Sequence, residues 1–377
     1  MRIGFLYSGG RLRRVEKVAA GTAPTEFFYG SEELRARGHE VPLFEMPEQT
    51  KRTLASRVVD RFRAQLPVKF TGELLDQARE LAAAVSRCDV LVVAGSGEAF
   101  VAEVWRLMGK IECPVVGIHC GLLNVNYSPI RKWTTRFLLN RTWTMLFGDG
   151  EFQPMIDFFG LDAGRVFVNQ CGIDVHFWTP GEIHGDYVLA VGNDGRRDYE
   201  LLMKAAARCR QNFVVVTRMA IKEPVPPNVR LVTGDFRQEI LSDQELRALF
   251  QNARCIVTPL IESRQPSGQS VCLQAMACGR PVILTRTEGL WSKSLRDGEN
   301  ILLVPPYDVE AMVTAIDGVY ANPQSAAALG AAGRETVRRE WTTDLYAQRL
   351  EAFVTTKVLP AEARNGATTK VAPSFSS

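Results

Sequence analysis

The sequence predicts an α/β protein of two doubly wound domains, each a mostly parallel sheet wrapped by helices. Three observations predict this fold class. Strand-like and helix-like patterns alternate along the chain. The alternation starts again after Pro180-Gly181, which marks a domain boundary. The length of 377 residues exceeds the usual domain size of roughly 100–200 residues, so it favours two domains over one.

The first series of elements predicts an N-terminal domain over residues 1–181. The apolar run at residues 3–7 predicts a strand that ends in the turn Ser8-Gly9-Gly10. A helical segment at residues 25–37 ends at Gly38, a typical C-cap residue. The run that follows Asp89 is short and entirely apolar, which is typical of a buried parallel strand. The other elements predicted here are strands at 40–44, 114–119, 142–147 and 165–168 and a helix at 97–110.

The second series predicts a C-terminal domain over residues 182–340. Its predicted elements are a helix at 199–210 and strands at 187–191, 213–217, 229–233, 255–259, 281–285 and 301–304. The helical pattern within residues 341–360 predicts a C-terminal helix that crosses back to the first domain. Small and polar residues dominate 361–377, so we expect a disordered tail there.

Composition excludes several classes of protein. Hydrophobic residues make up 46% and charged residues 23% of the chain, which argues against wholesale disorder. The net charge of +3 is too small to indicate nucleic-acid binding. Eight cysteines occur without a C-x-x-C pair, so we expect reduced core thiols and no zinc site. No apolar run approaches the roughly 20 residues that span a bilayer, and the N-terminal run is too short for a secretion signal. We therefore expect a cytoplasmic protein whose membrane contact, if it has one, is peripheral.

Residues 259–281 form the most informative stretch. A strand is followed by a polar loop, and Gly268 precedes a helix that begins near Gln269. Free N–H groups of Gln269, Ser270 and Val271 would make a diphosphate site there. The alternative is an ordinary strand-loop-helix capped by Ser267. Ligands of such sheets bind at the carboxyl ends of strands, so we expect a cleft between the domains. Dehydrogenases, periplasmic-type binders and glycosyltransferases all fit this pattern.

The run from Gln274 to Val282, QAMACGRPV, resembles the donor-binding signature of retaining glycosyltransferase family 4, the "group 1" transferases. Further segments resemble other landmarks of that family, and they occur in the same order along the chain. They are RGHEV at 37–41, GID at 172–174 with the Phe and Pro that follow, and DGEN at 297–300 with LVPP at 303–306. The resemblance is dense in the C-terminal half and thin in the N-terminal half. The resemblance implies the GT-B architecture, in which two Rossmann-like domains face an interdomain cleft.

The family's signature usually carries two glutamates, one that contacts the donor sugar and one that contacts the nucleotide ribose. Gln274 stands at the second position and can still hydrogen-bond ribose hydroxyls. The first position falls on Glu262 or Gln265. Glu262 is favoured because a carboxylate accepts two hydroxyl hydrogen bonds, and the alternative is a solvated loop glutamate.

The resemblance assigns further donor contacts. Arg196 and Arg197, expected on an exposed turn, match the positions that hold the donor diphosphate, a task that suits the guanidinium fork. Gly9 and Gly10 resemble the glycine-rich loop that faces the donor, and Phe236 resembles a base-contacting position. The dinucleotide fingerprint G-x-G-x-x-G is missing after the first strand, which counts against hydride transfer.

His119 ends the strand at 114–118, where first-domain side chains would enter the cleft. A lone histidine is more often structural than catalytic, as His39 at a helix-strand corner illustrates. Family members commonly carry a histidine at the matching strand end, beside the transferred sugar. The resemblance therefore makes His119, with Glu262, a candidate that positions the sugar.

Together these features predict the transfer of a sugar from a nucleoside-diphosphate sugar, preferably a UDP-sugar, to an acceptor hydroxyl held by the first domain, and the resemblance implies that the anomeric configuration is retained. The resemblance implies no metal and no cofactor, with the leaving diphosphate accepting the acceptor's proton. Rival interpretations are a GT-B-like phosphorylase, a sugar-nucleotide epimerase, and a degenerate transferase that acts as a partner subunit.

The stretch from Lys51 to Lys69 places six basic residues among apolar ones. The favoured interpretation is a solvated helix packed on the sheet, and a soluble glycan or small molecule is the favoured acceptor. The alternative is a basic amphipathic helix on anionic lipid, with a lipid-linked acceptor. Asp60 interrupts the basic face and counts against this alternative.

Overall fold

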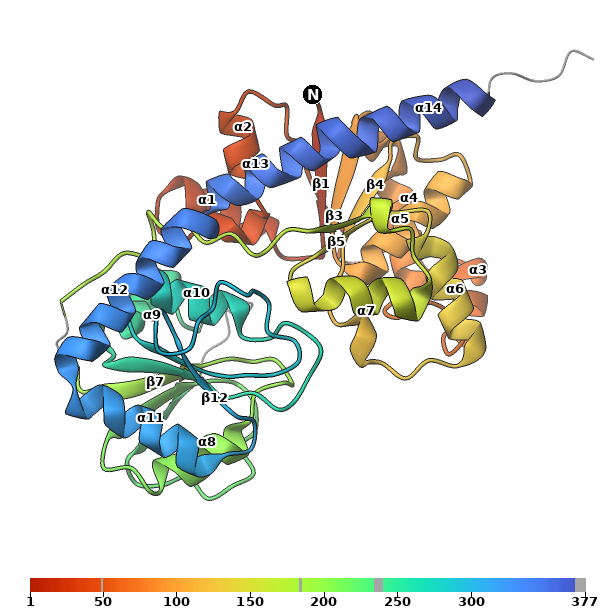
Figure 1. Cartoon of the computed structure of the whole chain (residues 1–377). Helices are drawn as coiled ribbons and strands as arrows, with labels where there is room; N and C mark the ends of the chain where they lie inside the picture. Colours follow the sequence, from red (N-terminus) through yellow and green to blue (C-terminus); the bar gives the residue numbers. More distant parts are fainter. Residues whose placement is uncertain (49, 183–184, 234–239, 370–377) are drawn as a thin grey trace, which may run out of the picture.

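A computed structural model of the chain describes residues 1–48, 50–182, 185–233 and 240–369. They form two six-stranded sheets, each with its own helices (Figure 1). The strand orders are β2-β1-β3-β4-β5-β6 and β12-β11-β10-β7-β8-β9, and every pairing between neighbours is parallel. The predicted fold class, α/β with two doubly wound domains, is confirmed.

The first sheet begins with a strand whose five residues are all buried, which explains its uninterrupted apolar sequence. Its strands are β1 (Ile3–Tyr7), β2 (Leu43–Glu45), β3 (Val90–Ala94), β4 (Val115–Ile118), β5 (Trp143–Leu146) and β6 (Val166–Val168). Its helices are α1 (Val15–Ala19), α2 (Ser31–Ala36), α3 (Leu54–Arg61), α4 (Gly72–Val85), α5 (Ser96–Leu107), α6 (Pro129–Leu139) and α7 (Asp149–Phe159). Short 3₁₀ turns connect them: η1 (Leu12–Arg14), η2 (Thr25–Phe28), η3 (Leu122–Asn124) and η4 (Ala163–Arg165).

The second sheet places its candidate site at the ends of two adjacent central strands, β7 and β10. Its strands are β7 (Tyr187–Val191), β8 (Asn212–Val216), β9 (Val229–Val232), β10 (Cys255–Thr258), β11 (Val282–Thr285) and β12 (Leu302–Val304). Its helices are α8 (Tyr199–Ala206), α9 (Asp243–Asn252), α10 (Gln269–Ala277), α11 (Val309–Ala321) and α12 (Pro323–Glu340).

The C-terminal helices, drawn in blue in Figure 1, run from the second domain back along the first. They are α13 (Thr343–Phe353), the π-helical turn η5 (Val354–Val358) and α14 (Leu359–Thr369). Tyr346, Leu350 and Phe353 are buried among apolar residues of the first sheet. The last strong helical pattern therefore completes the first domain's core.

The expected disorder from Ala361 onward is wrong as far as Thr369, because α14 extends to that residue. Glu362 provides the physical reason: its carboxylate accepts a 3.2 Å hydrogen bond from the indole of Trp143. It also lies 3.7 Å from Arg165 and 3.8 Å from Arg106. These contacts attach the start of α14 to the first domain. Residues 370–377 lie outside the described part of the chain.

Candidate functional site

Two loops of the second domain meet at one end of its sheet. The loop after β7 carries Arg196 and Arg197, and the loop after β10 leads into α10. The Ile261 amide donates to the Arg196 carbonyl at 3.0 Å, and a β-bridge pairs Arg197 with Leu260. Because β7 and β10 are parallel neighbours, their carboxyl ends meet at the same edge. The structure therefore brings the two arginines to the helix that was expected to bind phosphate.

The start of α10 combines a closely packed glycine with uncapped backbone N–H groups. Gly268, with φ +73°, precedes the helix, and a Cβ there would lie 2.5 Å from the Thr258 side chain. No side chain caps this helix, so its first N–H groups keep their bonding capacity. The buried Ser267 hydroxyl has no hydrogen-bond partner within the described residues. Free N–H groups and the helix dipole together favour an anion here.

Arg197 is buried, so its expected place on an exposed turn is wrong. Its Nε donates to the Val191 carbonyl at 3.2 Å, and its Nη1 lies 3.1 Å from the Asp194 carboxylate. A Cβ on Gly268 would lie 3.3 Å from the same Nη1, which places the guanidinium beside the start of α10. Arg196 is partly exposed, and its backbone amide donates to Asp194. Arg197 is therefore fixed in position, while Arg196 lies nearer to solvent.

The two candidates for the sugar-contacting position point to different surroundings. The exposed Glu262 carboxylate accepts 2.8 Å hydrogen bonds from the amides of Ser263 and Glu288, so it holds its own loop together. Gln265 instead contacts the first domain: its amide group lies 3.3 Å from the Cys120 sulfur and 3.3 Å from the Asn124 side chain. Of the two residues, only Gln265 contacts the loop that follows His119.

Further contacts of this segment join it to the first domain. The side-chain amide of Gln269 donates to the Phe147 carbonyl at 3.0 Å, and the side-chain amide of Asn124 donates to the Ser263 hydroxyl at 3.2 Å. Ser270, by contrast, is exposed. The loop and the start of α10 therefore lie against the ends of β4 and β5, at the boundary between the domains.

His119 lies at the end of β4 and is completely buried. Its ring stacks on Phe100, with 5.2 Å between the centroids. Neither ring nitrogen has a hydrogen-bond partner in the described part of the chain. Burial lowers the pKa of His119 to about 3, and the positive charge of Lys69 adds to the effect. The imidazole is therefore neutral near pH 7 and can offer a hydrogen bond but no charge.

Gln274 contacts an acidic residue of the first domain. Its side-chain amide donates a 2.9 Å hydrogen bond to Oε1 of Glu26. The same oxygen also accepts from the Trp178 indole at 2.8 Å. Oε2 of Glu26 accepts from the Asp174 amide at 2.9 Å. Burial raises the pKa of Glu26 to about 7 although all three hydrogen bonds favour its charged form. Glu26 was not predicted as a site residue, because nothing in its local sequence signals this contact.

A second acidic residue missed from the sequence is Glu151, in the first turn of α7. It is buried, and its Oε2 has no hydrogen-bond partner within the described residues. Burial raises its pKa to about 8, while the backbone N–H groups of Gly121 and Phe147 nearby act to lower it. Because Gly121 and Phe147 follow β4 and β5, Glu151 lies beside the two strand ends that the second domain contacts.

Gly9 and Gly10 follow β1 as expected, and Gly10 has φ +86° with nothing within 4 Å of a Cβ built on it. The neighbouring Arg11, which the sequence analysis did not single out, places its guanidinium 5.5 Å from the ring centroid of Tyr7 and 5.1 Å from that of Tyr29. Phe236 lies outside the described residues.

Neither a metal-binding cluster nor a membrane-spanning helix occurs among the described residues. No group of three or more His, Cys, Asp and Glu side chains there is placed to hold a metal ion. No helix in that part of the chain combines the length and apolarity needed to cross a bilayer.

Comparison with known proteins finds a family match in the second domain. Residues 185–322 match the family described as Glycosyl transferases group 1, which confirms the resemblance over this part of the chain. A D-inositol 3-phosphate glycosyltransferase of Pseudarthrobacter chlorophenolicus is 26% identical over 227 residues, which cover 54% of this chain and 53% of that protein. A GDP-mannose-dependent α-(1-6)-phosphatidylinositol monomannoside mannosyltransferase of Mycolicibacterium smegmatis is 39% identical over 71 residues, 19% of this chain and 18% of that protein. This chain thus spans about half the length, or less, of these relatives.

A solved structure is similar over both domains. Alr3699/HepE of Anabaena, crystallised with UDP and glucose, superposes with a TM-score of 0.69 at 12% identity, covering 94% of this chain and all of that one. At this identity the likeness concerns the fold, and the two-domain arrangement is the GT-B architecture.

Proposed function

We propose that this chain, whose residues 185–322 match the group 1 glycosyltransferases, transfers a sugar from a nucleoside-diphosphate sugar to an acceptor hydroxyl. One observation carries the proposal: the buried Arg197 lies beside the uncapped start of α10, at the ends of two adjacent strands. A guanidinium beside free helix N–H groups is a fitting site for a diphosphate.

In this proposal the protein accelerates the reaction mainly by electrostatic stabilisation. Negative charge grows on the diphosphate as the bond from its oxygen to the anomeric carbon breaks. Arg197, the more exposed Arg196 and the start of α10 neutralise that charge. The acceptor oxygen forms its bond to the anomeric carbon on the face that the phosphate leaves, and the departing phosphate oxygen takes the hydroxyl proton, so the anomeric configuration is retained. Because these groups supply the positive charge, the reaction needs neither a metal ion nor a cofactor.

The donor is proposed to be a UDP-sugar. The Anabaena structure, which shares the fold, contains UDP and glucose, and this supports the choice. The mycobacterial relative is named as a GDP-mannose-dependent enzyme instead, so a GDP-sugar is the specific alternative. The acceptor is proposed to bind the first domain near the ends of β1 and β4, where Gly10 and His119 lie.

A panel of UDP-, GDP- and ADP-sugars tests the proposal directly. We expect one family of donors to raise the melting temperature, since a ligand that binds the native state stabilises it. Labelled donor should then give a glycoside whose anomeric configuration, read by NMR, matches that of the donor, and excess EDTA should not slow its formation. Sugar 1-phosphate formed from inorganic phosphate would indicate a phosphorylase, and an altered nucleotide sugar an epimerase. Donor turnover by the purified chain alone would exclude a degenerate partner subunit.

A further inference from the structure

One face of the first domain exposes an unusual number of large apolar side chains. On α3 and just after it, the exposed fraction is 79% for Leu54, 45% for Val58 and 57% for Phe62. On α6 it is 58% for Ile130 and 64% for Trp133. Single exposed apolar residues are common, but such a group needs an explanation. We call the surface of α3, α6 and residues 62–66 between them the α3–α6 face.

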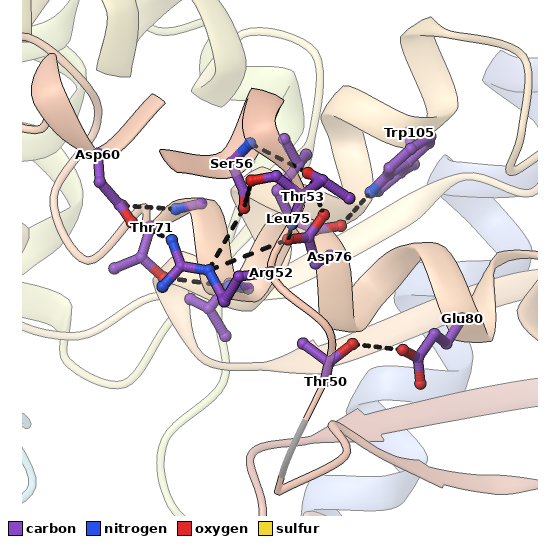
Figure 2. Close-up of polar contacts among 12 residues, drawn as sticks. Thr50, Arg52, Thr53, Ser56, Asp60, Thr71, Leu75, Asp76, Glu80 and Trp105 are labelled. Carbon is purple, nitrogen blue, oxygen red and sulfur yellow. Dashed lines mark hydrogen bonds and ion pairs between the residues drawn. The ribbon is translucent and has the colours of Figure 1, made fainter. Parts of the chain in front are cut away.

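The opposite side of α3 is held by polar contacts (Figure 2). The Thr53 hydroxyl caps the helix by accepting from the Ser56 amide at 3.1 Å. Asp76 on α4 accepts 2.9 Å hydrogen bonds from the amide and the hydroxyl of Thr53. Asp60 accepts from the Gly72 amide at 2.8 Å. Leu54, by contrast, is among the most exposed apolar residues, so the apolar stripe of α3 faces away from the domain.

Residues that follow α3 lie directly on α6. Arg131 donates from Nη2 to the Arg63 carbonyl at 2.8 Å and from Nε to the Leu66 carbonyl at 3.1 Å. The Thr134 hydroxyl donates to the Gln65 carbonyl at 2.7 Å. Figure 1 shows α3 and α6 on the same side of the first domain. The two apolar groups therefore belong to one continuous surface.

Basic residues accompany this surface, and acidic residues are nearly absent from its segments. Residues 50–72 contain six basic residues and one acid, Asp60, and residues 113–148 contain four basic residues and no acid. Asp60 forms an ion pair with Arg52 and binds the start of α4, so its charge is compensated locally. Arg57, Arg61 and Arg136 form no ion pair with the acids that the structure describes. Asp60 therefore no longer argues against a basic face.

We propose that the α3–α6 face docks on an anionic phospholipid bilayer. Leu54, Phe62 and Trp133 would enter the boundary between headgroups and acyl chains, where tryptophan is favoured. Arg57 and Arg61, one turn apart beside the apolar stripe, would bind lipid phosphates while their stems cover apolar surface. This goes beyond the proposed transfer reaction and does not depend on it, because docking requires neither donor nor acceptor.

The test uses the full chain and vesicles of phosphatidylcholine alone or mixed with an equal part of phosphatidylglycerol. We expect co-sedimentation with the mixed vesicles at low salt, weak binding to phosphatidylcholine alone, and release as salt rises. Arg57→Ser with Arg61→Ser should weaken binding roughly tenfold or more. Leu54→Ser with Phe62→Ser should weaken binding at every salt concentration.

Matched controls remove the same kinds of side chain elsewhere. Arg87→Ser with Arg338→Ser removes two exposed arginines outside the face, and Val225→Ser with Leu231→Ser removes two exposed apolar side chains of the second domain. These controls should bind as the wild type does. Equal losses in controls and face variants would overturn the assignment.

Trp133 gives a second readout, because it is the one tryptophan exposed above half of its surface. Anionic vesicles should shift the fluorescence emission of the wild type to shorter wavelength, and Trp133→Phe should abolish that shift. No binding at low salt would overturn the proposal. Self-association measured by light scattering, lost in Leu54→Ser with Phe62→Ser and without any vesicle binding, would assign the face to a second copy instead.

Discussion

The amide of Gln274 on α10 donates a 2.9 Å hydrogen bond to the carboxylate of Glu26 in the first domain. An acid at position 274 would face Glu26 as a like charge, whereas the amide donates to it. This contact gives a physical reason why the chain carries glutamine where the resembling signature usually carries glutamate.

The first prediction concerns this pair. Gln274→Glu should lower the free energy of unfolding by about 1–3 kcal/mol, because a donor is lost and a second buried carboxylate is gained. The loss should grow as pH rises through about 7, where Glu26 ionises. Adding Glu26→Gln should restore part of the stability, since an amide then faces a carboxylate again. Chemical unfolding of both single variants and the double variant measures the coupling. If the losses of stability in the two single variants simply add up in the double variant, the contact is contradicted.

The second prediction is the pH dependence that Glu26 causes. Its pKa is raised from 4.5 to about 7 in the folded protein, so the folded state binds the proton more tightly than the unfolded state does. Its contribution to stability is fully present below about pH 4.5 and is lost as pH rises through 7. The unfolding free energy of the wild type relative to Glu26→Gln should therefore fall between pH 5 and pH 8. A flat difference across that range would refute the raised pKa.

His119 should show the opposite slope. Its pKa is lowered from 6.5 to about 3, so protonation favours the unfolded chain. The unfolding free energy of the wild type relative to that of His119→Phe should be highest above about pH 6.5 and should decline as pH falls toward 3. If His119 also positions the sugar, His119→Phe should reduce kcat more than it weakens donor binding. An unchanged kcat in a folded variant would leave the residue a purely structural role.

Much of the fold follows from patterns local in sequence. The alternation of apolar runs and helical segments specifies both sheets, and Gly268 before an apolar helix indicates the start of α10. The burial of Arg197 could not be predicted in the same way. It depends on Gly192 and Gly268, from two different strand ends, which leave space for its side chain.

Contacts between distant segments account for the rest. Glu26 lies 248 residues from Gln274, and no periodic pattern relates such positions. The helix after Ala361 was not predicted, because a composition of small and polar residues does not reveal single contacts such as the hydrogen bond between Trp143 and Glu362. The sequence favoured Glu262 over Gln265 because of its carboxylate, whereas the contact of Gln265 with Cys120 depends on the tertiary structure.

The fourth prediction separates the two arginines. Arg197→Lys should weaken binding of a nucleoside diphosphate by about 1.5–3 kcal/mol, because a point charge replaces a fixed planar fork. Arg196→Ala should have a smaller effect, as its side chain lies nearer to solvent. Arg210→Ala, which removes an exposed arginine between α8 and β8, serves as the control. Isothermal titration calorimetry measures all three, and equal affinities in wild type and Arg197→Lys would contradict the assignment.

The central claim is that the diphosphate of the donor binds where Arg197 meets the start of α10. A crystal structure of the protein with the nucleoside diphosphate that binds most tightly tests it most directly. We expect phosphate oxygens within hydrogen-bonding distance of the Arg197 guanidinium and of the backbone amides that follow Gly268. A diphosphate bound elsewhere, in contact with neither group, would contradict this assignment.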